Sequence, residues 1–328
     1  MALSRGRWSP SRAARRWTLI IAGTTAVFLV ATGILLLVKD HPQRPAATRL
    51  LVARAADPSA VVALPDGALR YAERLTGRVR EIDPQGQLRR ELVARVSVRS
   101  TPGQRGLLGL AVDRHGATFA AWTRRSDARL VVGQVAPGPV RLVWTGPRSA
   151  TLANGGRLAF TPDGRLLIGI GDLERPGRTA DPAAPNGKLL LLDTRREPTQ
   201  VPRVVTGGWN NPFAFTYAPG GELWVADNAP GQRPERITRG DRKGAPVATT
   251  GTLRPLAPSA LVSLGPHRLG LCGYVSRVMR EIRVDGDGPT PPGRVLVDGC
   301  AIAATVLPDG RVVVTDDDTI RITTRPLR

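Results

Sequence analysis

The sequence predicts an all-β fold, a six-bladed β-propeller, because one short pattern recurs along most of the chain. The pattern is an apolar run, a turn rich in Gly, Pro and Asp, and a second apolar run, which is typical of a β-hairpin. Its turns lie at 66–67, 115–116, 163–164, 220–221, 265–266 and 309–310. A spacing of about 45–55 residues suits a four-stranded propeller blade. The alternative is six unrelated hairpins in a β-sandwich.

The blades are expected to follow one another along the chain after a short first strand. Their expected ranges are 59–96, 106–146, 153–205, 212–240, 260–299 and 301–325. The last range holds only three apolar runs, so that blade lacks one strand. We expect residues 48–54 to supply it, because pairing the first strand with the last closes the ring and removes an open sheet edge.

Residues 17–38 are apolar and uncharged, and at 1.5 Å per residue they are long enough to span a bilayer core of about 30 Å. Five arginines precede them, which favours a cytoplasmic N-terminus. The sequence therefore predicts a cytoplasmic basic tail (1–16), a single transmembrane signal anchor (17–38), a linker (39–47) and an extracytoplasmic propeller (48–328) at the cell membrane. A cleaved signal peptide is the alternative, although no Ala-x-Ala site follows the apolar run.

The formal net charge is +20, and its cations are almost all arginines; Lys39, Lys188 and Lys243 are the only lysines. The arginines are spread through every segment rather than gathered into a nucleic-acid-binding module, so nucleic acid is not an expected partner. Some affinity for anionic envelope polymers or lipid headgroups follows from the charge. A carbohydrate or an envelope protein remains the expected partner, in addition to the membrane.

Cys272 and Cys300 are the only cysteines. Outside the cytoplasm a pair of cysteines favours a disulfide. Two buried reduced thiols in strands are the alternative.

Several stretches together resemble the soluble quinoprotein glucose/sorbosone dehydrogenases. They are PGQRGLLGLAVD at 102–113, NGGRLAFTPDGRLLIGIGD at 154–172, NGKLLLLD at 186–193, GWNNPFAF at 208–215, GELWVADNAP at 221–230 and LPDGRVVVTDD at 307–317. The resemblance implies a six-bladed propeller that carries pyrroloquinoline quinone (PQQ) in its central funnel. It also implies calcium bridging the cofactor, and a histidine base that deprotonates a sugar hydroxyl while hydride passes to the quinone.

The position that the family gives to the base is Ala153, immediately before Asn154. A base for alcohol oxidation must reach the hydroxyl, and histidine suits this task near neutral pH. The three histidines of the chain are His41, His115 and His267, in the linker and in two turns, so none is a natural replacement.

The cofactor is a tricarboxylate, and the family holds it with arginines. The resemblance aligns that arginine pair with Cys300 and Ile302, and it aligns a further arginine with Asn210. None of the three side chains carries a positive charge that could pair with a carboxylate.

Other family positions keep suitable residues. The resemblance implies substrate-side or cofactor-binding roles for Gln104, Asn154, Asn211 and Arg277. It also implies that the backbone carbonyls of Ala229 and Pro230 hold the calcium ion.

These replacements favour a catalytically degenerate propeller, a pseudoenzyme that has lost PQQ and calcium and binds a ligand or a partner. One alternative is an active PQQ-dependent aldose dehydrogenase with rearranged residues. A second is another propeller enzyme, such as a metal-dependent lactonase, for which the candidate acids are Asp172, Glu174, Asp181 and Asp227.

Overall fold

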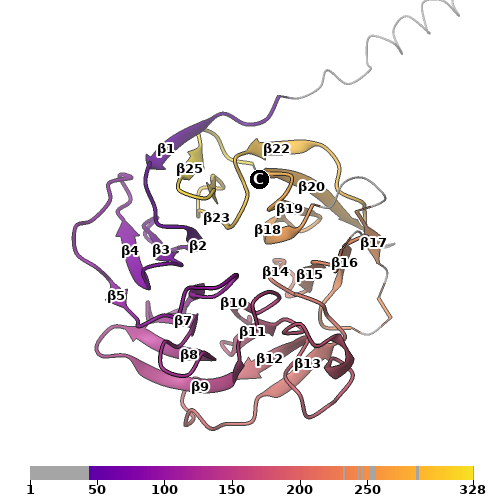
Figure 1. Ribbon diagram of the computed structural model, residues 1–328. Helices are drawn as coiled ribbons and strands as arrows, with labels where there is room; N and C mark the ends of the chain where they lie inside the picture. The colour runs from indigo at the N-terminus through magenta and orange to yellow at the C-terminus, as the bar shows by residue number, and fades with distance from the viewer. Residues whose placement is uncertain are drawn as a thin grey trace, which may run out of the picture. The chain divides into compact units, whose positions relative to one another are not determined.

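The protein folds as a ring of six antiparallel sheets around a central axis (Figure 1). The computed structural model describes residues 44–231, 233–242, 244–245, 247–250, 256–285 and 288–327. Pro45–Arg328 form one compact unit. The ring confirms the prediction of an all-β, six-bladed propeller and excludes a sandwich of two sheets.

The first three blades have four strands each, in chain order from the axis outward. Blade one is β2 (Pro58–Ala63), β3 (Leu69–Glu73), β4 (Arg78–Ile82) and β5 (Ala94–Arg95). Blade two is β6 (Leu107–Val112), β7 (Thr118–Thr123), β8 (Arg129–Ala136) and β9 (Arg141–Arg148). Blade three is β10 (Gly155–Phe160), β11 (Leu166–Ile170), β12 (Lys188–Leu192) and β13 (Arg203–Gly207), with a 3-10 turn at Pro176–Arg178 in the connection before β12.

Blade four is β14 (Ala214–Tyr217), β15 (Leu223–Asp227), β16 (Arg236–Arg239) and β17 (Ala248–Thr249). Blade five is β18 (Pro258–Gly265), β19 (Arg268–Gly273), β20 (Val278–Asp285), β21 (Gly288–Pro289) and β22 (Val295–Asp298), and both β21 and β22 pair with β20. Blade six contains β23 (Ala304–Val306), β24 (Val312–Thr315) and β25 (Ile320–Thr323).

The fourth strand of blade six comes from the other end of the propeller. Strand β1 (Thr48–Val52) pairs antiparallel with β25, with Thr48 opposite Thr323 (Figure 1). The amide of Thr324 donates to the carbonyl of Ala47 (2.9 Å) and extends the pairing. The expected closure of the ring by the N-terminal strand is therefore confirmed.

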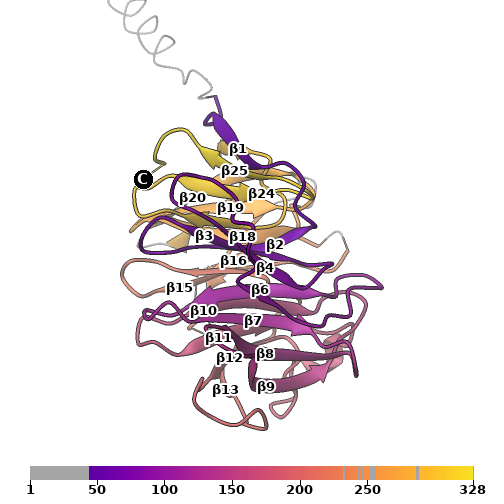
Figure 2. The same cartoon turned by 90° about the vertical axis from the view of Figure 1, so that its left-hand side faces the viewer.

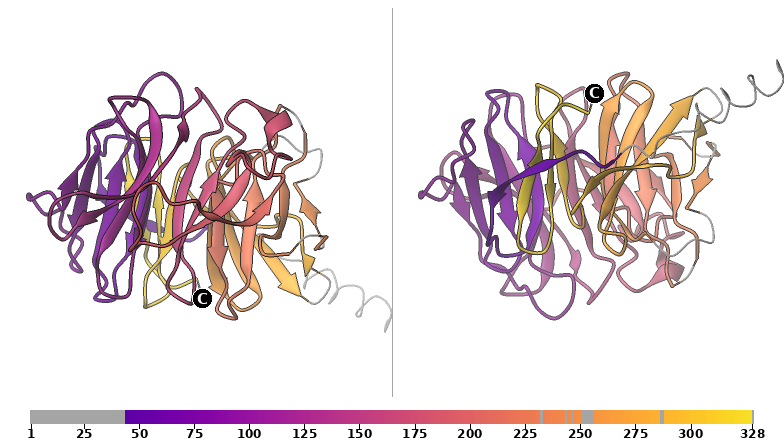
Figure 3. Two further views of the ribbon diagram at one scale, coloured as in Figure 1. Left: turned by 90° about the horizontal axis from the view of Figure 1, so that it is seen from below. Right: turned by 90° about the horizontal axis from the view of Figure 1, so that it is seen from above.

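Apolar side chains fill the spaces between neighbouring sheets, which stand side by side around the axis (Figures 2 and 3). Leu158 and Ile168 of blade three pack with Val132 and Trp144 of blade two. A second cluster joins blade six to blade one, and it includes Val52 of β1. The strand that closes the ring therefore also contributes to the core.

The antiparallel order gives the ring two different faces. All six innermost strands begin at one face, which we call the cavity face; the second-to-third-strand turns and the connections between blades lie there too. The tight turns between first and second strands lie at the opposite face, which we call the turn face. The glycines of these turns, Gly67, Gly116, Gly164, Gly221 and Gly310, have positive φ angles of 81–86°, a conformation that glycine adopts without steric cost.

Among the described residues, no helix is long and apolar enough to cross a bilayer. The span predicted at 17–38 lies outside the described residues, so the anchor stays a prediction.

Candidate functional site

A cavity of about 480 Å³ opens at the cavity face, where the six innermost strands begin. Residues from every blade line it: Asp57, Ser59, Arg74, Gly103, Gln104, Leu108, Leu152, Asn154, Gly155, Asn211, Phe213, Asn228, Ala257, Pro258, Ser259, Tyr274, Ala301, Ile302 and Asp317. A cavity shared by all the blades on the axis is the usual kind of place for a ligand site in a ring-shaped fold.

Three of the predicted site residues, Gln104, Asn154 and Asn211, do line this cavity. The Asn154 side chain donates to the carbonyls of Gln104 (2.9 Å) and Ala150 (3.1 Å) and accepts from the Ala150 amide (2.8 Å). Gln104 Oε1 accepts from the Ala153 amide (3.0 Å). Asn154 therefore holds the rim loops together. No described group accepts a hydrogen bond from Gln104 Nε2, so this donor can bind a ligand.

The oxygen and nitrogen of the Asn211 side-chain amide also have different roles. Its Oδ1 accepts from the Gly155 amide (3.0 Å), which links blade four to blade three. No described group bonds its Nδ2, so this donor too is available at the cavity wall.

Ala153 lies between the lining residues Leu152 and Asn154 and has a positive φ of 49°. Histidine is enriched several-fold over most residues in this left-handed region. The backbone at this position could therefore carry a histidine, but the alanine side chain supplies no proton acceptor.

Neither described histidine compensates. His115 lies in the β6–β7 turn, and His267 lies in the β18–β19 turn, where its Nδ1 is 3.2 Å from the carbonyl of Val284. Both turns belong to the turn face, at the opposite end of the channel from the cavity. His41 lies outside the described residues.

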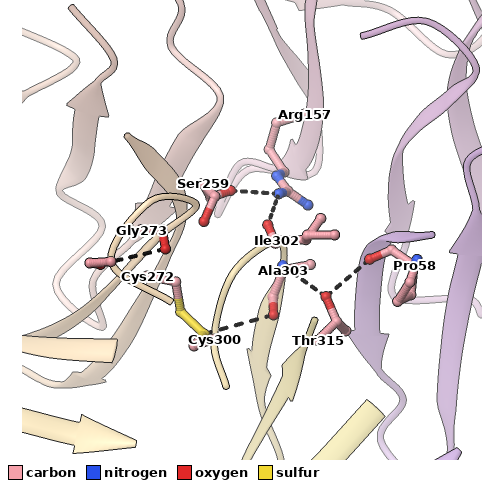
Figure 4. The surroundings of a disulfide bond; sticks show 10 residues. Pro58, Arg157, Ser259, Cys272, Gly273, Cys300, Ile302, Ala303 and Thr315 are labelled. Atoms are coloured by element: carbon pink, nitrogen blue, oxygen red, sulfur yellow. Dashed lines mark hydrogen bonds between the residues drawn. A yellow bond between two sulfur atoms is a disulfide. The ribbon is translucent and has the colours of Figure 1, made fainter. Parts of the chain in front are cut away.

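Cys300, aligned with one of the family's arginines, is bonded to Cys272 in a disulfide, and both residues are 0% exposed. Figure 4 shows the Cys300 side chain directed toward Cys272, beneath the loop that carries Ile302. The disulfide, favoured over free thiols from the sequence, is thus present. Ile302 does line the cavity, but with an apolar side chain.

Asn210, aligned with the third arginine, is also directed elsewhere. Its Nδ2 donates to Asp172 Oδ2 (2.7 Å), and its amide donates to both carboxylate oxygens of Asp227 (3.1 Å each). Asp227 also forms an ion pair with Arg236 (2.5 Å). Burial raises the pKa of Asp227, and the bond from Arg236 opposes that shift.

The acids considered for a lactonase are not gathered in the cavity, because none of Asp172, Glu174, Asp181 and Asp227 lines it. Asp172 accepts from the amide of Glu174 (2.8 Å), and Asp181 accepts from the amide of Ala183 (2.9 Å), so both cap turns. Among the described residues, no group of three or more His, Cys, Asp or Glu side chains could hold a metal ion.

Arg277 does not line the cavity. It forms ion pairs with Asp316 and with Asp317 (3.1 Å), and only Asp317 reaches the cavity wall. Ala229 and Pro230 directly follow Asn228, a lining residue, so the carbonyls proposed for calcium belong to a loop at the rim.

The charges of the cavity do not suit a tricarboxylate. Among the described residues that line it, the only cation is Arg74, whose Nε (2.8 Å) and Nη2 (2.5 Å) both donate to Asp57. Arg74 Nη1 donates to the carbonyls of Gly103 and Arg105 (3.0 Å each). Asp317 is a second lining acid. In the described part of the chain, Asp317 is offset only by Arg277, which does not line the cavity. Because the one lining arginine is committed to Asp57, the residues present do not fit PQQ with its carboxylates.

Sequence reasoning missed Arg157, which closes the channel beneath the cavity. Its guanidinium donates to the carbonyls of Ser259 (2.8 Å) and Ile302 (3.3 Å), as Figure 4 shows. It also donates to the carbonyls of Phe213 (3.1 Å) and Ser59 (3.3 Å), so its acceptors come from four other blades. Burial lowers the pKa of Arg157 to about 10, so it stays charged at neutral pH. The sequence signal that could have found Arg157 is a charged residue in the middle of an innermost strand.

The Ser259 hydroxyl was missed as well. It lines the cavity, the residue is 6% exposed, and its Oγ has no hydrogen-bond partner in the described structure. A buried hydroxyl without a partner costs free energy, which a ligand that bonds it would recover. With Gln104 Nε2 and Asn211 Nδ2, the cavity presents uncharged polar groups.

Comparison with known proteins gives one family. Residues 55–254 match the sequence profile of the family described as Glucose / Sorbosone dehydrogenase. No curated protein matches the chain significantly.

Solved structures match over most of the chain. A protein from Thermus thermophilus described as an oxidoreductase (glucose dehydrogenase) is 24% identical, with a TM-score of 0.68 over 84% of this chain and 99% of its own. The PQQ-bound aldose sugar dehydrogenase of Streptomyces coelicolor is 19% identical, with a TM-score of 0.67 over 86% and 99%. The apo form of the soluble aldose sugar dehydrogenase of Escherichia coli is 19% identical, with a TM-score of 0.70 over 85% and 100%. At these identities the structural likeness concerns the fold.

Proposed function

The chain belongs to the glucose/sorbosone dehydrogenase family, and we propose that this member is a membrane-anchored extracytoplasmic propeller that binds a ligand or a partner in its central cavity without PQQ-dependent oxidation. The observation that carries the proposal is the charge of the cavity. The single arginine among the described lining residues, Arg74, is already paired with Asp57, a second carboxylate lines the wall at Asp317, and Cys300 is bonded in a disulfide.

Two further observations support the proposal. The family's base position is Ala153, and both described histidines lie in turns at the opposite face. Loss of a general base typically costs about 10²–10⁴-fold in rate. Each lost charge-assisted bond to a buried carboxylate weakens binding by about 1.5–3 kcal/mol. Together these losses oppose both turnover and cofactor retention.

An active PQQ-dependent aldose dehydrogenase is the second candidate. It is favoured by Gln104, Asn154 and Asn211, which surround the cavity as the family pattern requires. In that case the cofactor would be held by contacts that the family does not use.

Titration of purified residues 45–328 with PQQ and calcium tests the proposal, because the quinone absorbance reports binding and a dye-linked assay reports sugar oxidation. The S. coelicolor aldose sugar dehydrogenase, whose structure contains PQQ, is the positive control. We expect no saturable binding at micromolar PQQ and no oxidation of aldoses above that of the cofactor alone.

The variant Ala153→His isolates the base from the cofactor site. The backbone at 153 accepts histidine, yet a base cannot act on a cofactor that is not held, so we expect no turnover. Ile302→Arg in the same chain adds a cation at the cavity wall and should raise PQQ affinity. Dye reduction by the unmodified protein with a sugar would contradict the proposal and favour the active dehydrogenase.

The membrane anchor is a separate part of the proposal and rests on residues 17–38 and the arginines before them. Protease added to intact spheroplasts should degrade the propeller, because it lies outside. Digestion only after lysis would contradict this topology. Release of the mature protein into the medium would indicate a cleaved signal peptide instead.

A further inference from the structure

A second hollow, of about 890 Å³, lies beside blades one and two. We call it the arginine groove, and Leu75, Thr76, Arg78, Arg95, Val96, Ser97, Val98, Arg99, Ser100, Thr101 and Arg125 line it. Its walls come from the β3–β4 turn, strand β5, the connection from blade one to blade two, and the β7–β8 turn. All of these segments belong to the cavity face.

Four arginines face this groove, and among the described residues no carboxylate lies within ion-pair distance of any of them. Other arginines of the chain do have carboxylate partners: Glu281 alone pairs with two, Arg268 (2.7 Å) and Arg294 (2.8 Å). Four like charges around one hollow repel one another unless an anion neutralises them. The groove is therefore a place where an anionic ligand lowers the energy of the protein.

The groove also has donors that are free to bind. The Nε of Arg78 is shielded from solvent and has no hydrogen-bond partner in the described structure. Arg99 Nη2 makes one long bond, to the carbonyl of Arg125 (3.3 Å). Ser97 and Ser100, whose side chains carry hydroxyls, also line the groove. Guanidinium and hydroxyl donors together suit carboxylate, sulfate or phosphate oxygens.

The groove continues toward the central cavity along the chain. Thr101 lines the groove, and Gly103 and Gln104 line the cavity two and three residues later. Likewise, Arg74 lines the cavity and Leu75 lines the groove. One extended molecule on this face could therefore contact both hollows.

The two hollows differ in chemistry, and the difference indicates the kind of molecule. The cavity offers uncharged donors such as Gln104 Nε2 and the Ser259 hydroxyl, which suit the hydroxyl groups of a sugar. The groove offers cations. The described residues that line it include no aromatic side chain, whereas proteins that bind single-stranded nucleic acid stack the bases on aromatic rings.

We propose that the cavity face binds an acidic sugar chain, with anionic groups in the arginine groove and a sugar unit in the central cavity. The inference rests on the proposed function in one respect, because it takes the cavity as a ligand site. It does not depend on whether PQQ binds.

Calorimetric titration of residues 45–328 with a hyaluronan hexasaccharide, in which acidic and uncharged sugar units alternate, tests the proposal, and the fully methyl-esterified hexamer is the matched neutral probe. We expect saturable binding of the acid at low salt, at least tenfold weaker binding of the ester, and loss of affinity as salt screens the charges. Equal affinity for both probes would overturn the role of the groove.

Variants locate the binding. Arg78→Gln, Arg95→Gln, Arg99→Gln and Arg125→Gln combined should weaken binding of the acidic hexamer about 100-fold or more, since each charge-assisted bond contributes about tenfold and the loss of two is enough for this effect. Because Arg78 is partly enclosed, the triple variant without it, which changes exposed side chains only, checks that the loss does not come from misfolding. The control changes four exposed arginines of the turn face, Arg90, Arg114, Arg141 and Arg203, to Gln. It removes the same charge and should keep the affinity within about twofold.

Three further outcomes would overturn the proposal. Equal losses of affinity in the groove variant and the turn-face control would show that only the net charge of the protein matters. Groove-dependent binding to phosphatidylglycerol vesicles, with no binding of the hexamer, would assign the groove to a lipid surface. Groove-dependent binding of an oligodeoxynucleotide alone would assign it to nucleic acid. Quinone absorbance and dye reduction, read in parallel, report failure of the proposed function separately.

Discussion

Loss of the Cys272–Cys300 disulfide should cost the propeller about 3.5 kcal/mol of unfolding free energy. The bridge closes a loop with a sequence separation of 28 residues, and the chain-entropy relation assigns about that value to a loop of this length. The bond joins β19 of blade five to the connection that enters blade six. Without it, the unfolded chain gains freedom that the folded ring does not share.

A double-mutant cycle separates the bridge from the packing of the sulfur atoms. Cys272→Ala and Cys300→Ala each remove the same bond, so each single variant should lose about 3.5 kcal/mol plus the packing of one buried sulfur. The double variant should lose little more than either single variant, which gives a coupling energy of about 3.5 kcal/mol. Urea unfolding of residues 45–328, followed by circular dichroism, measures all four proteins.

Reduced wild type, unfolded and refolded with a thiol reductant, is the control, because it keeps both sulfur atoms and lacks only the bond. It should unfold at a urea concentration close to that of the variants. The reasoning would be refuted if the double variant lost the sum of the two single-variant losses of unfolding free energy, or if its total loss were below about 1 kcal/mol. The disulfide would then constrain neither the unfolded chain nor the path into blade six.

Two more predictions concern closure and pH. Removal of residues 45–54 should lower the melting temperature of the whole propeller, because it exposes β25 and takes Val52 out of the core between blades six and one; an unchanged melting temperature would contradict closure by β1. Burial tends to raise the pKa of Glu281, but the bonds from Arg294 and Arg268 outweigh it and hold the pKa below its ordinary value of 4.5. The advantage of wild type over Glu281→Gln, about 1.5–3 kcal/mol, should therefore be complete above about pH 4.5 and decline as the pH falls through the lower folded value. Urea unfolding from pH 7 to pH 3 measures it, and a constant difference would show that the charge of Glu281 is not responsible.

The fold could be predicted from the sequence because its repeating unit is local. Each Pro-Asp-Gly or related turn fixes a hairpin by its own chemistry, and the missing strand of the last blade follows from counting. Strand β1 could be assigned in the same way, since a ring with an open edge must find a partner for it. The order of the turns and apolar runs along the chain was sufficient to predict these features.

The cavity was less predictable, because its properties depend on which side chains meet across blades. The motif order placed Gln104, Asn154 and Asn211 at the cavity. It did not indicate that the Asn154 side chain bonds the rim loops. The bond from Arg74 to Asp57 joins two loops of blade one, and Arg157 reaches carbonyls of four other blades. No spacing in the sequence indicates which of the many arginines has a carboxylate beside it.

The arginines of this protein are of two kinds, those with a carboxylate beside them and those without. Composition alone suggests a diffuse cation, but many arginines of the ring are neutralised locally, as Arg70 is by Glu81 (2.9 Å). Local pairing leaves little field at a distance, because the opposite charges cancel within a few ångströms. The potential of the cavity face is therefore set by the arginines without a carboxylate, and four of these line one groove. A net charge of +20 would make this protein adhere to many anions, whereas an unpaired cluster next to a cavity whose described lining holds no free cation can select a ligand that has both anionic and uncharged parts.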